Sequence, residues 1–412
     1  MNHRYSMLGT PPHTPALSAK DEYAEEASDS LFDVSVGNNT TLDEESFASM
    51  EKSDPYISPV SLHNPDFSFS PKVEHENFHH EKKGYILKDD HLSQYKHYKL
   101  HHRKLEDFVL PRSFFNVKLL DRLGTGSNSY VYGAAISSPA YGPRTVAIKI
   151  PGSRSKVKYL EREALFIVML KQFRSDVGES VHEYPFIDAH GLYYLNREDF
   201  NLIKKNDELP CLIMKKMSCN LTQFIKERRD YARPDQIAIG KRYWCKLCGT
   251  LLHALKVLKA LRSVHCDLKT DNVMISFSTK EEERSPIFKI GDFSSASTVE
   301  ELHGLPDTTL QFSAPELIDS SSGVNASTQT DLFSCGMILL TAATGRMPYQ
   351  AYSYDQIYLV SLAAKNKVLE VLERESLNIL RANPEIYHLI IMIIKDRCTL
   401  DDALSYYRRS WC

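Results

Sequence analysis

Three polar side chains of different kinds lie within six residues of one another near the middle of the chain: Asp267, Lys269 and Asn272. A carboxylate can orient a hydroxyl group and accept its proton. An amine two residues later can neutralise charge on a phosphoryl group, and a carboxamide can help to hold a metal ion. These residue types at this spacing predict the transfer of a phosphoryl group to a hydroxyl.

Residues 265–272 resemble the catalytic loop of eukaryotic-type protein kinases, which usually opens with His-Arg-Asp, although Cys266 stands in place of the Arg. The resemblance implies that Asp267 is the catalytic base, that Lys269 contacts the transferred phosphoryl group and that Asn272 binds metal. A lysine two residues after the base resembles the serine/threonine-specific members.

A glycine-containing turn and a later strand lysine match the ATP site of the same family. Gly124 and Gly126 would let backbone N–H groups approach phosphate oxygens. Lys149 ends a Val-Ala-Ile-Lys sequence and would hold the α- and β-phosphates. Its acidic partner is Glu163 or Glu161, and we favour Glu163 because it directly precedes an apolar helix face.

The resemblance also implies contacts with the adenine of ATP. Met214 is expected at the back of the pocket, and the backbone at Lys215 and Met217 is expected to bind the base. Ser129 replaces the usual third glycine and is expected to place a hydroxyl at the loop tip. A dinucleotide-binding fold is disfavoured because a strand follows the glycines. The predicted nucleotide-binding residues are Leu123, Gly124, Gly126, Ser129, Val131, Ala147, Lys149, Glu163, Met214 and Met217.

Residues 292–294 resemble the metal-binding Asp-Phe-Gly of the family, with Ser294 in place of the Gly. Asp292 is expected to bind Mg²⁺ across the β- and γ-phosphates, and Asn272 is expected to be the second metal ligand. Serine restricts the backbone relative to glycine, so we expect a less mobile loop here.

Other positions match residues that stabilise the family's site. Glu316, in an Ala-Pro-Glu sequence, is expected to pair with Arg397, and Asp331 is expected to accept backbone hydrogen bonds from the catalytic loop. Cys266 removes the arginine that often binds a phosphorylated activation segment. We therefore expect activity without phosphorylation of that segment. Its possible acceptors are Thr298, Thr308, Thr309 and Ser313.

The order of predicted elements supports an α+β, bilobal protein-kinase fold, in which a small antiparallel sheet and one helix precede a mainly helical lobe. We predict a kinase domain over residues 111–412, with its lobes at about 114–217 and 218–412. Strands are predicted at 115–120, 130–135 and 145–150 and near 193 and 212. Helices are predicted at 157–172, 244–261, 330–344 and 384–395.

Residues 1–110 have weak apolar periodicity and are rich in Ser, Thr, Pro and charge, so we predict a largely disordered arm. The arm is acidic at first and basic at residues 96–104. That basic cluster could be a nuclear-import or docking signal, although a solvated linker is the preferred interpretation. Four proline-directed steps could accept phosphate: Thr10-Pro11, Thr14-Pro15, Ser58-Pro59 and Ser70-Pro71.

Composition limits the partners. A formal charge of −3 gives no general attraction for nucleic acid, and no apolar stretch reaches the roughly 20 residues that a membrane helix needs. Eight scattered cysteines, without a recognisable signal peptide, lead us to expect an intracellular protein of the nucleus, the cytoplasm or both. Cys245 and Cys248 have redox or zinc spacing, but core packing in a helix is favoured.

We therefore predict an ATP- and Mg²⁺-dependent kinase that phosphorylates serine and threonine hydroxyls of protein substrates. The alternative is a pseudokinase that binds nucleotide or partners without catalysis, for which Cys266, Ser294 and Ser129 are the evidence. A small-molecule phosphotransferase is disfavoured. The variant loop and the long arm resemble kinases of large DNA viruses, herpesviruses among them, and a divergent cellular kinase of a unicellular eukaryote fits nearly as well.

Overall fold

The structure is a computed structural model that describes residues 105–112, 116–137, 143–180, 184–200, 203, 207–229, 235–277, 285–301, 309–318 and 323–412. The predictions for the arm before residue 105, including its basic cluster and proline-directed steps, lie outside these residues. The prediction for Thr308 also lies outside them.

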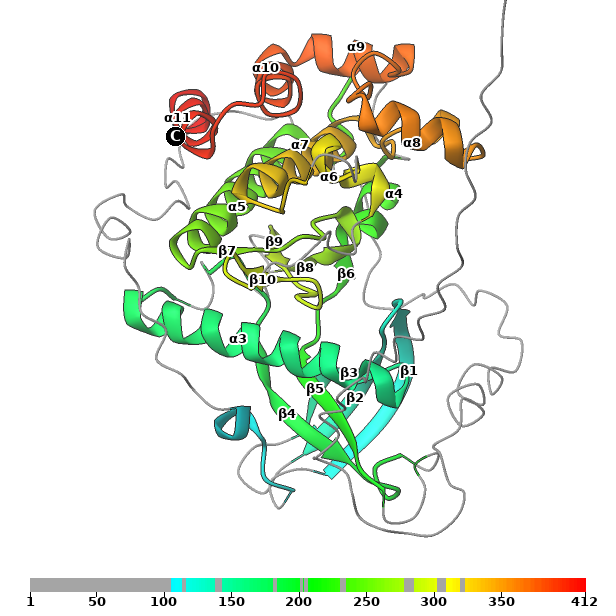
Figure 1. Cartoon of the computed structure of the whole chain (residues 1–412), viewed down its shortest axis with the longest axis vertical. Coiled ribbons are helices and arrows are strands. Elements are labelled where there is room, and N and C mark those ends of the chain that lie inside the picture. The colour runs from blue at the N-terminus through cyan, green and yellow to red at the C-terminus, as the bar shows by residue number, and fades with distance from the viewer. Residues whose placement is uncertain are drawn as a thin grey trace, which may run out of the picture. The chain divides into compact units, whose positions relative to one another are not determined.

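The small lobe is an antiparallel sheet of five strands with one long helix, as predicted. Its strand order is β1-β2-β3-β5-β4, and α3 lies between this sheet and the large lobe (Figure 1). Gly178 ends α3 in the left-handed region, with φ of 68°. The elements are β1 (Asn116–Thr125), β2 (Ser129–Ser137), β3 (Arg144–Pro151), α3 (Val157–Val177), β4 (Ala189–Leu195) and β5 (Leu209–Lys215).

Each face of the sheet packs on its own apolar cluster. One cluster contains Ile148 and Ile150 of β3 together with Val117 of β1. The other cluster contains the inner face of α3 and continues into the large lobe. Strand residues alternate between faces, so the near-continuous burial of β3 reflects cover on both sides.

The described residues include a segment before the predicted domain boundary at residue 111. The short 3₁₀ helix η2 (Leu105–Phe108) and the residues that follow it run along β4, and the Leu110 N–H donates to the Leu192 carbonyl at 2.7 Å. Phe108 is buried in the cluster beneath α3. The predicted boundary therefore falls after a segment that already packs on the small lobe.

The large lobe is built around α5 and α7. The indole N–H of Trp244, on α5, donates to the Leu339 carbonyl of α7 at 2.9 Å. A capping box at Ser327 starts α7, and Gly336 lets α10 approach closely, since a Cβ there would lie 2.7 Å from Ile393. The helices are α4 (Leu221–Arg229), α5 (Lys241–Ala260), α6 (Pro315–Ile318), α7 (Thr328–Thr344), α8 (Gln356–Ala364), α9 (Arg374–Ala382), α10 (Pro384–Ile394) and α11 (Leu400–Trp411).

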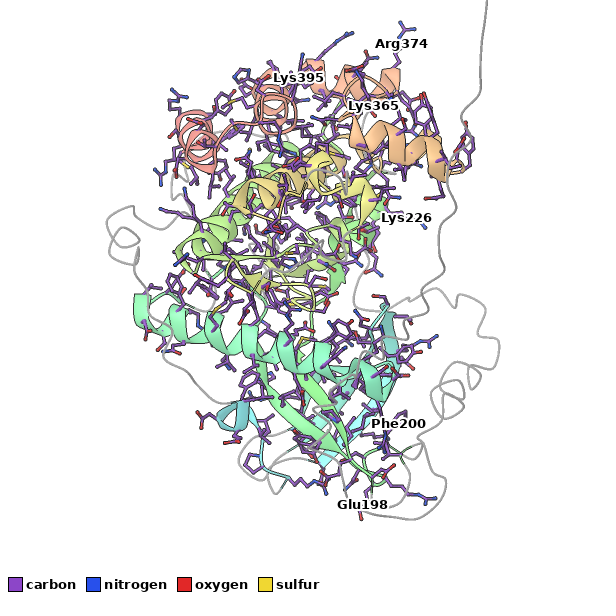
Figure 2. The ribbon with its side chains drawn as sticks, in the orientation of Figure 1. Glu198, Phe200, Lys226, Lys365, Arg374 and Lys395 are labelled. Atoms are coloured by element: carbon purple, nitrogen blue, oxygen red, sulfur yellow. The ribbon has the colours of Figure 1, made fainter. Side chains whose placement is uncertain are left out.

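Charged side chains of the outer helices point away from these packed faces. Figure 2 shows Arg374 projecting from the large lobe, and Lys365 and Lys395 are also exposed. Leu389 and Ile390 of α10, in contrast, are fully buried. This division is the amphipathic pattern from which the helix at 384–395 was predicted.

Short strands near the site were not predicted. They form a three-stranded sheet of order β6-β8-β9 and a two-stranded pair of β7 and β10. Because each is short, none carries a clear alternating pattern. Their bounds are β6 (Cys219–Asn220), β7 (Ser263–Val264), β8 (Val273–Phe277), β9 (Pro286–Ile290) and β10 (Ser297–Thr298).

Two expectations from composition can be compared with the described residues. No helix among them is long and apolar enough to cross a membrane. Cys248 is fully buried on α5, Cys245 is partly buried beside it, and both are free thiols. Packing in a helix, the favoured interpretation of this pair, is confirmed.

Candidate active site

One face of the small-lobe sheet gathers several of the predicted nucleotide-binding residues. Val131 pairs with Lys149, and Ala147 pairs with Met214 across antiparallel strands. Paired residues point to the same face, and so do residues two apart on one strand. These four side chains therefore share a face, and the contacts of Lys149 direct that face toward Asp292.

Leu123 reaches the same face through an irregularity in β1. The register shifts between Arg122 and Gly124, which is where a β-bulge redirects a side chain. A Cβ built on Gly133, the residue two after Val131, would lie 3.9 Å from Leu123 Cδ1. Leu123 therefore lies on the face of the sheet that also carries Val131.

The glycine turn is shorter than predicted, because β1 extends to Thr125 and β2 begins at Ser129. The Gly126 N–H donates to the Ser129 carbonyl at 2.8 Å and closes the turn. Ser129 is consequently a strand residue that pairs with Pro151 and is 8% exposed. The prediction that its hydroxyl lies at the loop tip is wrong.

Lys149 forms an ion pair with two carboxylates. Its ammonium lies 2.6 Å from Glu163 Oε2 and 2.7 Å from Asp292 Oδ1. Burial opposes the charge of Lys149, yet Asp292 and Glu163 together raise its pKa. Burial raises the pKa of Glu163 despite the nearby lysine. Of the two acidic candidates, Glu163 is the residue that contacts Lys149.

The Asp292 carboxylate is held from several sides. Burial opposes its ionisation, but Lys149 and the Ser294 hydroxyl, which donates at 2.9 Å, lower its pKa overall. Asp292 has a φ of 59°, and the next N–H, that of Phe293, donates to Glu163 Oε1 at 3.2 Å. The Phe293 ring stacks on Phe166 of α3. The loop of Asp292 is thereby tied to α3.

Asp331, at the start of α7, holds the backbone that precedes Asp267. Its carboxylate accepts the N–H groups of His265 at 2.7 Å and of Cys266 at 3.1 Å, which confirms its predicted bracing role. Cys266 has a φ of 68°, a backbone conformation that residues other than glycine rarely adopt. These two hydrogen bonds fix that conformation and hence the direction of Asp267.

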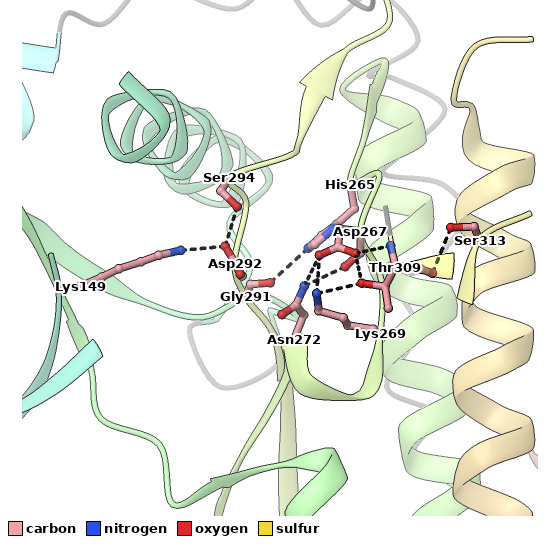
Figure 3. Close-up of polar contacts among 10 residues, drawn as sticks. All are labelled: Lys149, His265, Asp267, Lys269, Asn272, Gly291, Asp292, Ser294, Thr309 and Ser313. Atoms are coloured by element: carbon pink, nitrogen blue, oxygen red, sulfur yellow. Dashed lines mark hydrogen bonds and ion pairs between the residues drawn. The ribbon is translucent and has the colours of Figure 1, made fainter. Parts of the chain in front are cut away.

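The three residues of the opening motif converge on one carboxylate (Figure 3). Lys269 Nζ lies 2.7 Å from Asp267 Oδ2. Asn272 Nδ2 donates to the Asp267 carbonyl at 2.7 Å and to its Oδ2 at 3.3 Å. The carboxylate is therefore oriented by side chains on its own loop.

Thr309 was predicted as a possible phosphate acceptor in a segment on the substrate side, and the structure brings its side chain into contact with the catalytic loop. Its N–H donates to Asp267 Oδ1 at 3.1 Å, and its hydroxyl donates to the same oxygen at 2.8 Å. The same hydroxyl accepts from Lys269 Nζ at 2.9 Å. Ser313 supports the position of Thr309 by donating to its carbonyl (Figure 3).

Asp292 and Asn272 each have an oxygen atom of the kind that binds a magnesium ion. Lys149 and Ser294 both donate to Oδ1 of Asp292, so Oδ2 is the oxygen that this residue can offer. Asn272 uses its amide nitrogen toward Asp267, which leaves its amide oxygen as the possible ligand. One or two protein ligands together with phosphates are usual for Mg²⁺. Among the described residues, no cluster of three His, Cys, Asp or Glu could hold a metal.

Met214 and Met217 lie where the chain leaves the small lobe. Met214 is 8% exposed near the end of β5, and Met217 follows that strand by two residues. The N–H of Lys215 donates to the Asp188 carbonyl at 2.9 Å. The predicted hydrogen bond from Lys215 to adenine is therefore restricted to its carbonyl oxygen.

The predicted pair between Glu316 and Arg397 is present, with the Arg397 guanidinium donating to Glu316 Oε1. The guanidinium also lies 4.8 Å from the centre of the Phe333 ring on α7. This pair fixes the end of the activation segment to the large lobe. Its role is structural, and it takes no part in the reaction.

Comparison with known proteins identifies related sequences. The family model described as "Protein kinase domain" matches residues 194–405. The serine/threonine-protein kinase ISR1 of Saccharomyces cerevisiae is 30% identical over 232 residues, which are 55% of this chain and 51% of the relative. The protein of the same name in Eremothecium gossypii is 27% identical, over 56% of this chain and 59% of that protein. This chain therefore spans between half and two thirds of these relatives.

A more distant relative is the dual specificity tyrosine-phosphorylation-regulated kinase 2 of Drosophila melanogaster, which is 25% identical over 56% of this chain and 28% of that protein. These relatives come from two fungi and a fly, so the narrower resemblance to viral kinases gains no support.

The matched region begins within β4, so the glycine turn and Lys149 lie before it. Their assignment rests on the ion pair of Lys149 with Glu163 and Asp292 and on the strand register described above. The matched residues contain the loop of Asp267 and the whole large lobe up to residue 405. Fold, site geometry and family match together show that the chain belongs to the protein kinase family.

Proposed function

We propose that this protein transfers the γ-phosphoryl group of Mg-ATP to serine and threonine hydroxyls of protein substrates. One observation carries the proposal: the groups that such a transfer needs are assembled in two connected clusters. Lys149, Glu163 and Asp292 form the first cluster, and Asp267, Lys269 and Thr309 form the second. The Gly291 N–H donates to the Asn272 carbonyl at 2.9 Å and links the two loops.

In this proposal the first cluster binds the nucleotide. Lys149 holds the α- and β-phosphates, Glu163 fixes the direction of Lys149, and Asp292 with Asn272 binds the magnesium ion. Bound Mg²⁺ would neutralise charge on the β- and γ-phosphates. Gly124 supports this arrangement, because a Cβ there would meet nothing within 4 Å and its φ is not positive. The fold alone does not require glycine at that position, whereas close approach of a phosphate does.

The second cluster serves the acceptor. Asp267 orients the acceptor hydroxyl and accepts its proton, while Lys269 neutralises charge on the moving phosphoryl group. Thr309 holds both side chains, so it is a positioning residue. The names of the two fungal relatives support serine and threonine as acceptors.

We also propose that the protein is active without phosphorylation of its activation segment. Cys266 is 6% exposed and carries no charge that could bind a phosphate. A preparation treated with phosphatase should keep its transferase activity, and loss of activity would refute this part of the proposal. Free thiols at all eight cysteines support action inside the cell, in the nucleus, the cytoplasm or both.

The decisive experiment measures transfer of labelled γ-phosphate from Mg-ATP to a peptide library by the full-length protein. Asp267→Ala should abolish transfer, whereas Asp271→Ala, on the same loop, should leave it nearly unchanged. Nucleotide binding is measured in parallel by the shift in melting temperature. Stabilisation by Mg-ATP without any transfer would refute the proposal and identify a pseudokinase.

A further inference from the structure

We propose that residues 105–110, which precede the region matched by the family, form a strap that holds α3 in its active position. Phe108 is the positioning residue of this strap. The inference rests on the proposed kinase function, because its consequence is the rate of phosphoryl transfer.

The strap extends the sheet at the edge formed by β4. Val109 forms a parallel bridge with Leu192, and the Leu110 N–H donates to the Leu192 carbonyl at 2.7 Å. Side chains two apart on an extended segment point to one face, so successive residues reach opposite faces. Val109 accordingly packs against the cluster beneath α3, whereas Leu110 packs against the cluster on the other face of the sheet. Phe108, at the end of η2, is also buried in the cluster beneath α3. The strap therefore contacts both cores of the small lobe.

Gly191 on β4 leaves the space that this strap occupies. A Cβ at Gly191 would lie 2.5 Å from the Phe108 carbonyl oxygen and 2.8 Å from Leu110 Cγ, both too close for real atoms. Gly191 does not have a positive φ, so its own backbone does not demand glycine. Glycine is needed here because the strap passes directly over it.

Lys171 joins the strap to α3. Its ammonium donates to the Ala189 carbonyl of β4 at 2.8 Å and lies 5.1 Å from the centre of the Phe108 ring. Such a placement combines a hydrogen bond with a cation–π contact. Phe108 itself is 9% exposed. The second half of α3 is thereby fixed between β4 and the strap.

Fixing this part of α3 also determines where Glu163 lies. Eight residues separate Glu163 from Lys171, which is about 12 Å along a helix. A tilt of about 10° at Lys171 would move Glu163 by about 2 Å, given that rise per residue. The ion pair between Glu163 and Lys149 is only 2.6 Å long, so this shift would break it. The same tilt would disturb the stack of Phe166 on Phe293.

Two full-length variants test the strap from opposite sides. Phe108→Ala removes the anchor, and Gly191→Ala pushes the strap away while leaving Phe108 intact. Both should lower kcat about tenfold with little change in the KM for peptide, and Phe108→Leu should restore most of the rate. Asp107→Ala and His190→Ala, which alter exposed residues of the strap and of β4, are the matched controls.

Amide hydrogen exchange in α3 provides a second readout that does not depend on activity. Exchange over Val157–Val177 should accelerate in both strap variants and stay unchanged in both controls. Wild-type kcat and wild-type exchange in folded strap variants would overturn the inference, even if their melting temperatures fell. If the wild-type protein transfers no phosphate, the proposed function fails, and the exchange measurement still decides whether the strap holds α3.

Discussion

The Thr309 hydroxyl gives the sharpest test of the site, because it contacts the two side chains that would act on the acceptor. It donates to Asp267 Oδ1 at 2.8 Å and accepts from Lys269 Nζ at 2.9 Å. Thr309→Val removes both hydrogen bonds while nearly keeping the shape of the side chain. The backbone N–H of residue 309 can still donate to Asp267.

The size of the effect follows from the charges of the two partners. A hydrogen bond to a charged group contributes about 1.5–3 kcal/mol. Asp267 and Lys269 also contact each other directly, so the variant keeps part of their orientation. We therefore expect the two lost hydrogen bonds together to raise the activation free energy by about as much as one such bond contributes, about 1.5–3 kcal/mol. That loss corresponds to a fall in kcat of roughly 10- to 100-fold.

The assay is steady-state transfer to a peptide at saturating Mg-ATP, with the melting temperature measured for each variant. Thr309→Ser keeps the hydroxyl and should retain activity within a few-fold of the wild type. The KM for ATP should change little in either variant, because Thr309 touches none of the nucleotide-binding residues named above. A folded Thr309→Val protein with kcat within twofold of the wild type would refute the positioning role.

Three further predictions concern stability and reactivity. Lys149→Met should lower kcat about a hundredfold or more. It should also lower the free energy of unfolding measured in urea, and the decrease should be smaller in acid than at pH 8. Burial raises the pKa of Glu163, and a protonated, uncharged Glu163 tolerates the loss of the lysine cation better than a charged one. Asp331→Ala should cost about 3 kcal/mol in the same assay, since two backbone donors lose a charged acceptor. A thiol reagent at pH 8 should modify exposed Cys412 first, because burial raises the pKa of Cys398 to about 11. Equal labelling of the two cysteines in a peptide mass map would contradict this.

The main elements of the fold could be predicted because their sequences repeat with the period of the structure they form. The prediction for α3 ended at 172, whereas the helix continues to Val177 and ends at Gly178. Helix ends depend on capping more than on periodicity, so such differences are expected. The strap could not be predicted, because its few residues are ordered by contacts with β4 and α3, and no local pattern reveals those contacts.

Helical periodicity was sufficient to choose between Glu161 and Glu163 as the partner of Lys149. Residues 160, 163, 164 and 167 lie on one face of an α-helix, and Leu160, Ala164 and Ile167 are buried there. Glu163 belongs to this face and is 1% exposed, whereas Glu161 is partly exposed. A buried carboxylate on an apolar face needs a cation, and Lys149 supplies it.

Thr309 escaped prediction for a different reason. It lies 42 residues from Asp267 along the chain. A lone threonine has no periodicity that could place it. Only the fold, which brings the end of the activation segment beside the catalytic loop, shows its contacts with Asp267 and Lys269.

The position of Cys266 now has a physical interpretation that supports activity without activation-segment phosphorylation. The left-handed backbone at Cys266 is held by Asp331, whose two accepted hydrogen bonds require no phosphate. The nearby β10 pairs with β7, and Arg162 of α3 donates to the Ser297 hydroxyl of β10 at 2.9 Å. Thus the first part of the activation segment is joined to both α3 and the large lobe by contacts among unmodified residues. An arginine at position 266 would add a receptor for phosphate, whereas hydrogen bonds to the Asp267 carboxylate come from Asn272 and Thr309.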